Sequence, residues 1–152
     1  MEARRIQESS TVVSQLMLPI DANPVGNVHG GTIMKLVDEV GGVVAMRHCR
    51  QRVVTARIDE MSFLHPVYVG DLVTLKASVN GVGRTSMEVG VRVEAENLRT
   101  GKVVHTSSAH LVYVALDSEG RPTEVPDLIA ETEVELRRME AARARRVRRG
   151  RA

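Results

Sequence analysis

Apolar and polar residues change their spacing along the chain, and the first clear pattern is helical. Apolar side chains recur every three to four positions in one stretch, at Ile33, Met34, Val37, Val40 and Val44. This spacing predicts a long amphipathic helix from Gly30 to about Cys49. Upstream, the β-branched residues 11–18 predict a strand that ends at Pro19, and turn formers at 21–27 predict a loop.

Downstream of the helix, apolar and polar residues alternate as they do in strands. The predicted strands are residues 53–63, 72–80, 87–96 and 103–116. Turn formers at 81–84 and at Thr100-Gly101 leave short connections between them. Connections this short require antiparallel neighbours.

These elements predict an α+β protein with the hotdog fold, an antiparallel curved sheet wrapped around one long central helix. A single amphipathic helix beside a single sheet has to bury its apolar face against that sheet. We expect a flexible N-terminus over residues 1–10, the hotdog domain over 11–128 and a basic C-terminal helix or tail over 129–152.

The C-terminal segment predicts a second, charged helix that begins near Glu131. It carries eight Arg against four Glu, with the acidic residues first, which suits the helix dipole. Its apolar face is thin and consists of Val134, Leu136 and Met139. We therefore expect weak docking and fraying beyond about Arg145.

Composition narrows the class of protein. The 152 residues fit one domain, and one Phe, two Tyr and no Trp provide no aromatic platform for nucleic-acid bases. The lone Cys49 excludes an intrachain disulfide and a Cys-rich metal site. No secretory signal and no membrane-length apolar run are found, so we expect a cytoplasmic protein.

The start of the long helix is a candidate site for a developing negative charge. The first amides of a helix have no internal partners, and Gly30 and Gly31 leave them bare. Such amides suit an oxyanion hole for a thioester carbonyl. The alternative is that the two glycines merely permit a tight turn into the helix.

Asp38 is the candidate catalytic acid on this helix. It projects toward a face of small and apolar residues, with Met34 four positions before it and Gly42 four positions after it. Neighbouring Glu39 has Lys35 four positions before it, and this spacing predicts an ordinary surface ion pair. We therefore assign the chemistry to Asp38 and the surface to Glu39.

The run from Asp21 to Gly42 resembles the signature of hotdog-fold acyl-CoA thioesterases, in particular the cytosolic, brain-type acyl-CoA hydrolases and their bacterial relatives. Other segments are similar to the same family: Arg47–Cys49, Val53–Thr55, Val69–Asp71, Ser86–Val89, Val125–Leu128 and Glu131–Glu133. The resemblance extends from about Val12 to Glu140.

The resemblance implies that Asp38 is catalytic, that the loop residue Asn23 orients the reacting groups, and that Gly30 or Gly31 supplies the oxyanion amide. From spacing alone, Asn23 is a turn residue before Pro24. A single short chain that carries both side chains implies a symmetric homodimer, with Asn23 from one subunit and Asp38 from the other. The family further suggests a hexamer of three such dimers.

Coenzyme A contacts are expected at the hairpin that carries Arg84, Thr85 and Ser86, although the same residues also suit a simple turn. The resemblance also implies a Ser near the position of Ala56 in some relatives; in this chain either Thr55 substitutes for that Ser or the role is absent. His29 is expected to support the turn into the helix and is grouped with these substrate-binding residues.

The sequence therefore predicts an acyl-CoA thioesterase that releases a free fatty acid and coenzyme A, with Asp38 as general base or nucleophile. No His spacing suggests a metal site, and no cofactor is expected beyond the coenzyme A of the substrate. Two rivals remain: a hotdog acyl-CoA hydratase, and a non-catalytic acyl-CoA-binding regulatory module.

Overall fold

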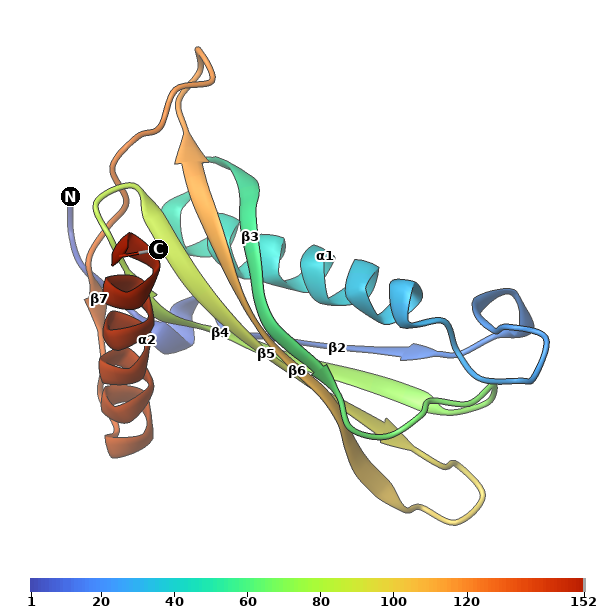
Figure 1. The fold of residues 1–152 in the computed structure, drawn as a ribbon. Coiled ribbons are helices and arrows are strands. Elements are labelled where there is room, and N and C mark those ends of the chain that lie inside the picture. Colours follow the sequence, from blue (N-terminus) through green and yellow to red (C-terminus); the bar gives the residue numbers. More distant parts are fainter. Residues whose placement is uncertain (152) are drawn as a thin grey trace.

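The computed structural model describes residues 1–151 as one curved sheet with two helices (Figure 1). In chain order the elements are β1 (Arg4–Arg5), η1 (Ile6–Glu8), β2 (Thr11–Leu16), η2 (Pro19–Asp21), α1 (Gly30–Cys49), β3 (Arg52–Phe63), β4 (Leu72–Val82), β5 (Ser86–Glu96), β6 (Val103–Leu116), β7 (Leu128–Ile129) and α2 (Glu133–Arg151). The main sheet is antiparallel with the order β2-β4-β5-β6-β3, and β1 pairs in parallel with β7. The predicted hotdog arrangement is confirmed.

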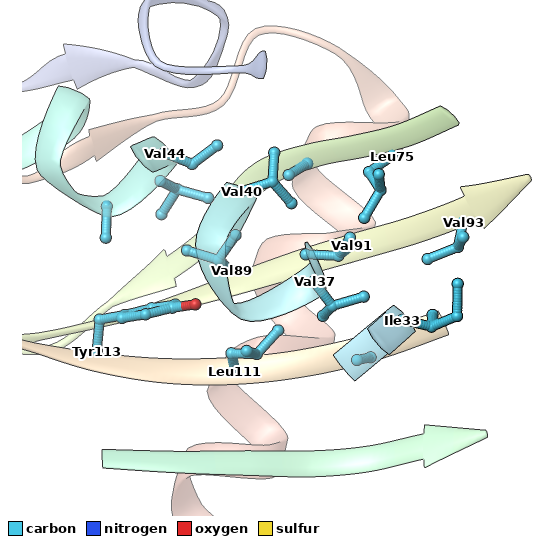
Figure 2. Packing of buried hydrophobic residues seen from close by; sticks show 14 of the residues in the cluster. Ile33, Val37, Val40, Val44, Leu75, Val89, Val91, Val93, Leu111 and Tyr113 are labelled. Carbon is cyan, nitrogen blue, oxygen red and sulfur yellow. The ribbon is translucent and has the colours of Figure 1, made fainter. Parts of the chain in front are cut away.

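Helix α1 packs on one face of the sheet through its apolar stripe. Figure 2 shows its side chains Ile33, Val37, Val40 and Val44 facing those of the central strands β5 and β6. Full burial of such a side chain contributes roughly 1.5–3 kcal/mol. This contact therefore fixes the orientation of α1 and the position of every polar side chain that the helix carries.

The N-terminal segment differs in detail from the predicted elements. The first strand ends at Leu16, two residues early, because Leu18 N donates to Asp21 Oδ2 at 2.8 Å and Pro19 opens η2. The first ten residues contain β1 and η1, and the side chain of Ile6 is buried. The division of the chain at residues 10 and 128 remains a prediction.

Helix α2 docks on the opposite face of the sheet, but only in part through the predicted apolar residues. Val134 and Leu136 are 43% and 50% exposed, whereas Glu135 and Ala142 are buried. A Cβ on Gly81 of β4 would lie 3.0 Å from the Ala142 methyl carbon and 4.0 Å from the backbone oxygen of half-buried Met139, so the helix approaches the sheet closely there. The predicted docking face was therefore wrong for Val134 and Leu136.

Charged side chains tie α2 to the sheet. Arg145 donates two hydrogen bonds of 2.8 Å to the carboxylate of Glu88 in β5, whose side chain is 4% exposed. Arg149 donates to Asp59 of β3 at 3.0 Å and contacts Glu88 at 3.4 Å. These contacts lie at and beyond Arg145, where fraying was predicted, and they hold that part of the helix.

The outer strand β3 exposes apolar side chains along an edge that has no strand partner within residues 1–151. Val54, Ile58 and Phe63 are 46%, 36% and 51% exposed. Register shifts interrupt its pairing with β6 after Thr55 and after Asp59. An exposed apolar edge of this kind is a template for pairing with another chain.

Candidate active site

The carboxylate of Asp38 lies between α1 and the edge strand β3. Its Oδ1 atom accepts a hydrogen bond of 2.7 Å from the hydroxyl of Thr55. The hydroxyl of Tyr113 lies 3.2 Å from the same oxygen and 2.8 Å from the backbone carbonyl oxygen of Asp38. Within residues 1–151 the Oδ2 atom has no hydrogen-bond donor, so one carboxylate oxygen is anchored and the other is open.

Tyr113 reaches the helix because residue 41 is glycine. The Tyr113 side chain is 1% exposed, and a Cβ on Gly41 would collide with its hydroxyl. Burial and the nearby negative charge of Asp38 raise the pKa of Tyr113 far above its ordinary value, so this hydroxyl stays protonated and available as a donor. Tyr113 was not singled out from the sequence, where it reads as a core residue of an apolar strand.

The opening turn of α1 has the predicted bare amides. The backbone N–H groups of Gly30 and Gly31 have no acceptor within residues 1–151, and both residues are exposed. His29 caps the helix through its backbone: its carbonyl accepts from Thr32 N at 3.0 Å, and its own N–H donates to Asp21 O at 3.0 Å. Its side chain makes no capping hydrogen bond.

Asn23 is fixed by the turn in which it lies. Its Oδ1 atom accepts hydrogen bonds of 3.1 Å from the backbone N–H groups of Val25 and Asn27. Within residues 1–151 its amide nitrogen has no acceptor. Asn23 lines a hollow of about 330 Å³ together with Gly30 and Phe63, so the structure brings the asparagine and the opening of α1 into one pocket.

Asp38 does not line that pocket. It lies eight residues beyond Gly30, which corresponds to about 12 Å along the axis of α1. A carbonyl group held at the Gly30 amide is therefore too far from the carboxylate of the same chain for direct attack or activation through one water. This distance argues against a complete site on one helix, and the site divided between two subunits stays a prediction.

The hairpin predicted to contact coenzyme A is present, and α2 lies beside it. Gly83 N donates to Ser86 O at 2.8 Å to close the turn, and the side chain of Arg84 is exposed. Ser86 lines a hollow of about 310 Å³ together with Arg143 and Arg146 of α2. The arginines of the tail suggest a phosphate contact, but periodicity alone does not place the tail beside this hairpin, because that placement depends on how α2 docks.

Three further residues considered in the sequence, Cys49, Lys35 and Glu39, lie in surroundings that give them no catalytic role. Burial raises the pKa of the Cys49 thiol, which makes it less reactive. Lys35 and Glu39 are both exposed, and the described part of the chain has no salt bridge between them.

Among residues 1–151, no group of three His, Cys, Asp or Glu side chains is placed to hold a metal ion. Within the same range, neither helix has the length and apolarity to cross a membrane.

The chain is similar to known proteins over nearly its whole length. A family model described as "Thioesterase superfamily" matches residues 25–102. The cytosolic acyl coenzyme A thioester hydrolase of Rattus norvegicus is 37% identical over 146 residues, which cover 95% of this chain and 38% of that one. An apo-hexameric acyl-CoA thioesterase superposes with a TM-score of 0.95 at 39% identity, over 99% of this chain and 97% of that chain.

A further solved structure contains ligands. The acyl-CoA hydrolase of Staphylococcus aureus, in complex with butyryl coenzyme A, coenzyme A and coenzyme A disulfide, superposes with a TM-score of 0.91 at 34% identity. The match covers 97% of this chain and 90% of that one. The curved sheet around one helix is thus a hotdog-fold domain, and these relatives are thioester hydrolases. The chain belongs to the thioesterase superfamily, and the resemblance noted in its sequence is confirmed.

Proposed function

We propose that this protein hydrolyses acyl-CoA thioesters to a free fatty acid and coenzyme A, and that Asp38 performs the chemistry. The observation that carries the proposal is the half-anchored carboxylate. Thr55 holds Oδ1, while Oδ2 has no hydrogen-bond donor within residues 1–151. A carboxylate with a fixed rotamer and one open oxygen suits a general base or a nucleophile.

The spacing of three residues supports this assignment. Structures of the S. aureus hydrolase include variants in which an Asn, an Asp and a Thr were each replaced by Ala. In that protein the Asp follows the Asn by 15 positions, and the Thr follows the Asp by 17 positions. The same intervals separate Asn23, Asp38 and Thr55 in this chain.

In the proposed reaction, the carbonyl oxygen of the thioester accepts hydrogen bonds from the amides of Gly30 or Gly31 as negative charge develops. The side-chain amide of Asn23 orients the carbonyl or the attacking water. Asp38 accepts a proton from water as the water oxygen bonds to the carbonyl carbon. The carbon–sulfur bond then breaks, and the sulfur leaves as the thiolate of coenzyme A. The same arrangement of residues also suits a second route, in which Asp38 attacks the carbonyl carbon directly, coenzyme A leaves, and water hydrolyses the resulting anhydride.

The site is proposed to lie between two subunits. Asp38 contacts Thr55 near the start of β3, whereas the Asn23 pocket includes Phe63 at its end. In an antiparallel two-fold pairing of β3 edges, the start of one strand lies beside the end of the other. A dimer axis near the middle of β3 therefore brings Asp38 of one subunit to the Asn23 pocket of its partner and covers the exposed side chains Val54 and Ile58.

A hexamer built from three such dimers is proposed as the full assembly. Two structural relatives are described as hexameric. The other sheet edge, β2, supports a second contact because Val12, Val13 and Leu16 are 65%, 40% and 45% exposed. The acyl chain would lie at the helix–sheet interface between paired subunits. A cytoplasmic location, as named for the rat relative, belongs to the same proposal.

Coenzyme A is proposed to bind along the hairpin, with Arg84 contacting a phosphate and Thr85 and Ser86 contacting the pantetheine arm. Ser86 pairs with Val114 of β6, which pairs with Val54 of β3, so the hairpin lies at the Asp38 end of the sheet. In this proposal Thr55 does not contact coenzyme A but donates its hydrogen bond to Asp38. His29 contributes its backbone groups to the turn that begins α1. The proposed reaction uses no metal and no cofactor.

A thiol-release assay across a series of acyl-CoA chain lengths tests the function. The wild type should release free coenzyme A, and Asp38→Ala should lower turnover by a factor of about 10³ or more while the fold is retained. Glu39→Ala, one position along the same helix, is the matched control and should keep full activity.

Each rival has its own signature in this assay. A hydratase would change the acyl chain without releasing thiol, and a binding module would retain acyl-CoA unchanged. Hydrolysis that survives Asp38→Ala would remove Asp38 from the mechanism.

A further inference from the structure

Tyr113 makes a contact with Asp38 that the proposed chemistry does not yet use. Its hydroxyl lies 2.8 Å from the backbone oxygen of Asp38 and 3.2 Å from Oδ1. A phenolic hydroxyl has one proton, so it donates to one of these oxygens at a time or shares the proton between them. Donation to the backbone oxygen ties α1 to the sheet beneath it, and donation to Oδ1 holds the carboxylate itself.

The contact between Tyr113 and Asp38 requires a glycine in α1, and this glycine lowers the stability of the helix. Glycine in a helix interior is less stable than alanine by roughly 0.5–1 kcal/mol. Gly41 nevertheless occupies the middle of α1, at the one turn where a Cβ would collide with the Tyr113 hydroxyl. At Gly42 a Cβ would make an ordinary contact of 3.8 Å with the same ring. The close approach of the hydroxyl therefore depends on Gly41 in particular.

The strand register places both hydroxyls on the same side of Asp38. Tyr113 of β6 pairs directly with Thr55 of β3, so their side chains project from the same face of the sheet toward α1. Two hydroxyl groups therefore converge on Oδ1, and Oδ2 has no hydrogen-bond donor within residues 1–151. Because the Tyr113 hydroxyl is buried, water cannot replace it easily if it is removed.

We propose that Tyr113 is a positioning residue for Asp38. Together with Thr55 it holds Oδ1, so that Oδ2 is the reacting oxygen. Gly41 leaves the space on the helix that the Tyr113 hydroxyl occupies. This inference rests on the proposed catalytic role of Asp38. It assigns Tyr113 no contact with the substrate. Its removal should therefore change turnover and leave substrate binding alone.

The test is Tyr113→Phe, which removes the hydroxyl and keeps the ring that fills the core. A displaced carboxylate should lower kcat about tenfold, while KM stays within about twofold. Thr106→Val is the matched control. It removes another buried hydroxyl of β6, one that donates to Val93 O at 3.3 Å, about 23 Å along the strand from Tyr113. It should leave kcat unchanged.

A second variant guards against a simple loss of folding. Gly41→Ala should displace the Tyr113 hydroxyl and lower kcat to a similar degree, whereas Gly42→Ala should not. In the Asp38→Ala background, Tyr113→Phe should have no further effect on the residual rate.

The outcomes separate this inference from the proposed function. Turnover that survives Asp38→Ala would overturn both. Loss of turnover in Asp38→Ala, with an unchanged kcat in Tyr113→Phe, would overturn the positioning role alone. A raised KM with an unchanged kcat in Tyr113→Phe would also overturn it, because it would place the hydroxyl in substrate binding.

Discussion

Thr55 donates its hydroxyl proton to Oδ1 of Asp38 across 2.7 Å, and this hydrogen bond joins the edge strand β3 to the central helix. The donor lies beside a register shift, because residue 56 has no partner in β6 while Thr55 and Arg57 pair with Tyr113 and Val112. Such bulges re-aim neighbouring side chains. The expectation that Thr55 takes the role of a hydroxyl near Ala56 remains a prediction, and this contact supports it.

The Thr55 hydroxyl can be tested by a pair of substitutions. Thr55→Val keeps the shape of the side chain and removes the donor, so kcat should fall about tenfold as the carboxylate loses its anchor. Thr55→Ser retains the hydroxyl and should keep most of the activity. Steady-state thiol release measures both. Equal losses in the two variants would mean that the methyl group matters and the hydrogen bond does not.

Subunit complementation tests the divided site. Asn23→Ala and Asp38→Ala are each expected to be inactive alone. If each site takes Asn23 from one subunit and Asp38 from the other, refolding an equal mixture should restore about one quarter of wild-type activity, because half of the dimers are mixed and each mixed dimer has one intact site. Mixed samples that stay inactive would place both residues in the same subunit's site.

Replacing Glu88 tests the docking of α2. Glu88→Gln leaves the partly buried Arg145 without its carboxylate, and the free energy of unfolding should fall by about 3 kcal/mol. Glu94→Gln, on the same strand, removes the surface partner of Lys76, which is 53% exposed, and should cost less than about 1 kcal/mol. Urea unfolding gives both values. Similar losses would show that the Arg145 pair adds nothing to docking.

Acid should destabilise the fold in two stages. Burial, together with the charge of Arg145, lowers the pKa of His110 below 6.5, so its contribution is complete above pH 6.5 and is lost as the pH falls through the folded value. Burial alone would raise the pKa of Glu88, but hydrogen bonds from Arg145 and Asn80 outweigh it and hold the pKa below 4.5. The contribution of Glu88 is complete above pH 4.5 and is lost below that.

The two stages can be separated by mutation. His110→Gln should flatten the slope of unfolding free energy against pH just below 6.5, by up to about 1.4 kcal/mol per pH unit, and leave the stage below 4.5 intact. Glu88→Gln should remove the lower stage. Urea titrations from pH 3 to pH 8 give the slopes. An unchanged slope in His110→Gln would show that another group titrates in that range.

The periodicity of apolar residues was sufficient to predict the main helices and strands, but it did not predict the side-chain contacts between them. Helix α1 begins and ends where its apolar spacing predicted, because that spacing is the cause of its burial. The firm docking of the end of α2 was not predicted, because it depends on Arg145 meeting Glu88. On β5, Glu88 reads as an ordinary solvent-facing residue in an alternating strand.

The candidate site shows the same limit. Asp38 stood out because an acid on a face of small residues conflicts with simple amphipathicity. The structural reason for Gly41, by contrast, is Tyr113, which lies 72 positions away, and only the pairing of β6 with β3 brings the Tyr113 hydroxyl under the helix. The distance between Asp38 and the Asn23 pocket likewise follows from three-dimensional placement.

The ion pairs of Arg145 with Glu88 and of Arg149 with Asp59, which hold α2 on the sheet, also bear on the order in which the chain folds. Arg145 follows Glu88 by 57 positions and Arg149 follows Asp59 by 90, so both carboxylates are synthesised before their arginine partners. Until those arginines leave the ribosome, the two carboxylates have no cations from α2. The sheet can form around α1 while translation continues, but the face that α2 covers is closed only after both arginines have emerged. Covering that face is therefore a later step in the birth of each subunit than forming the sheet.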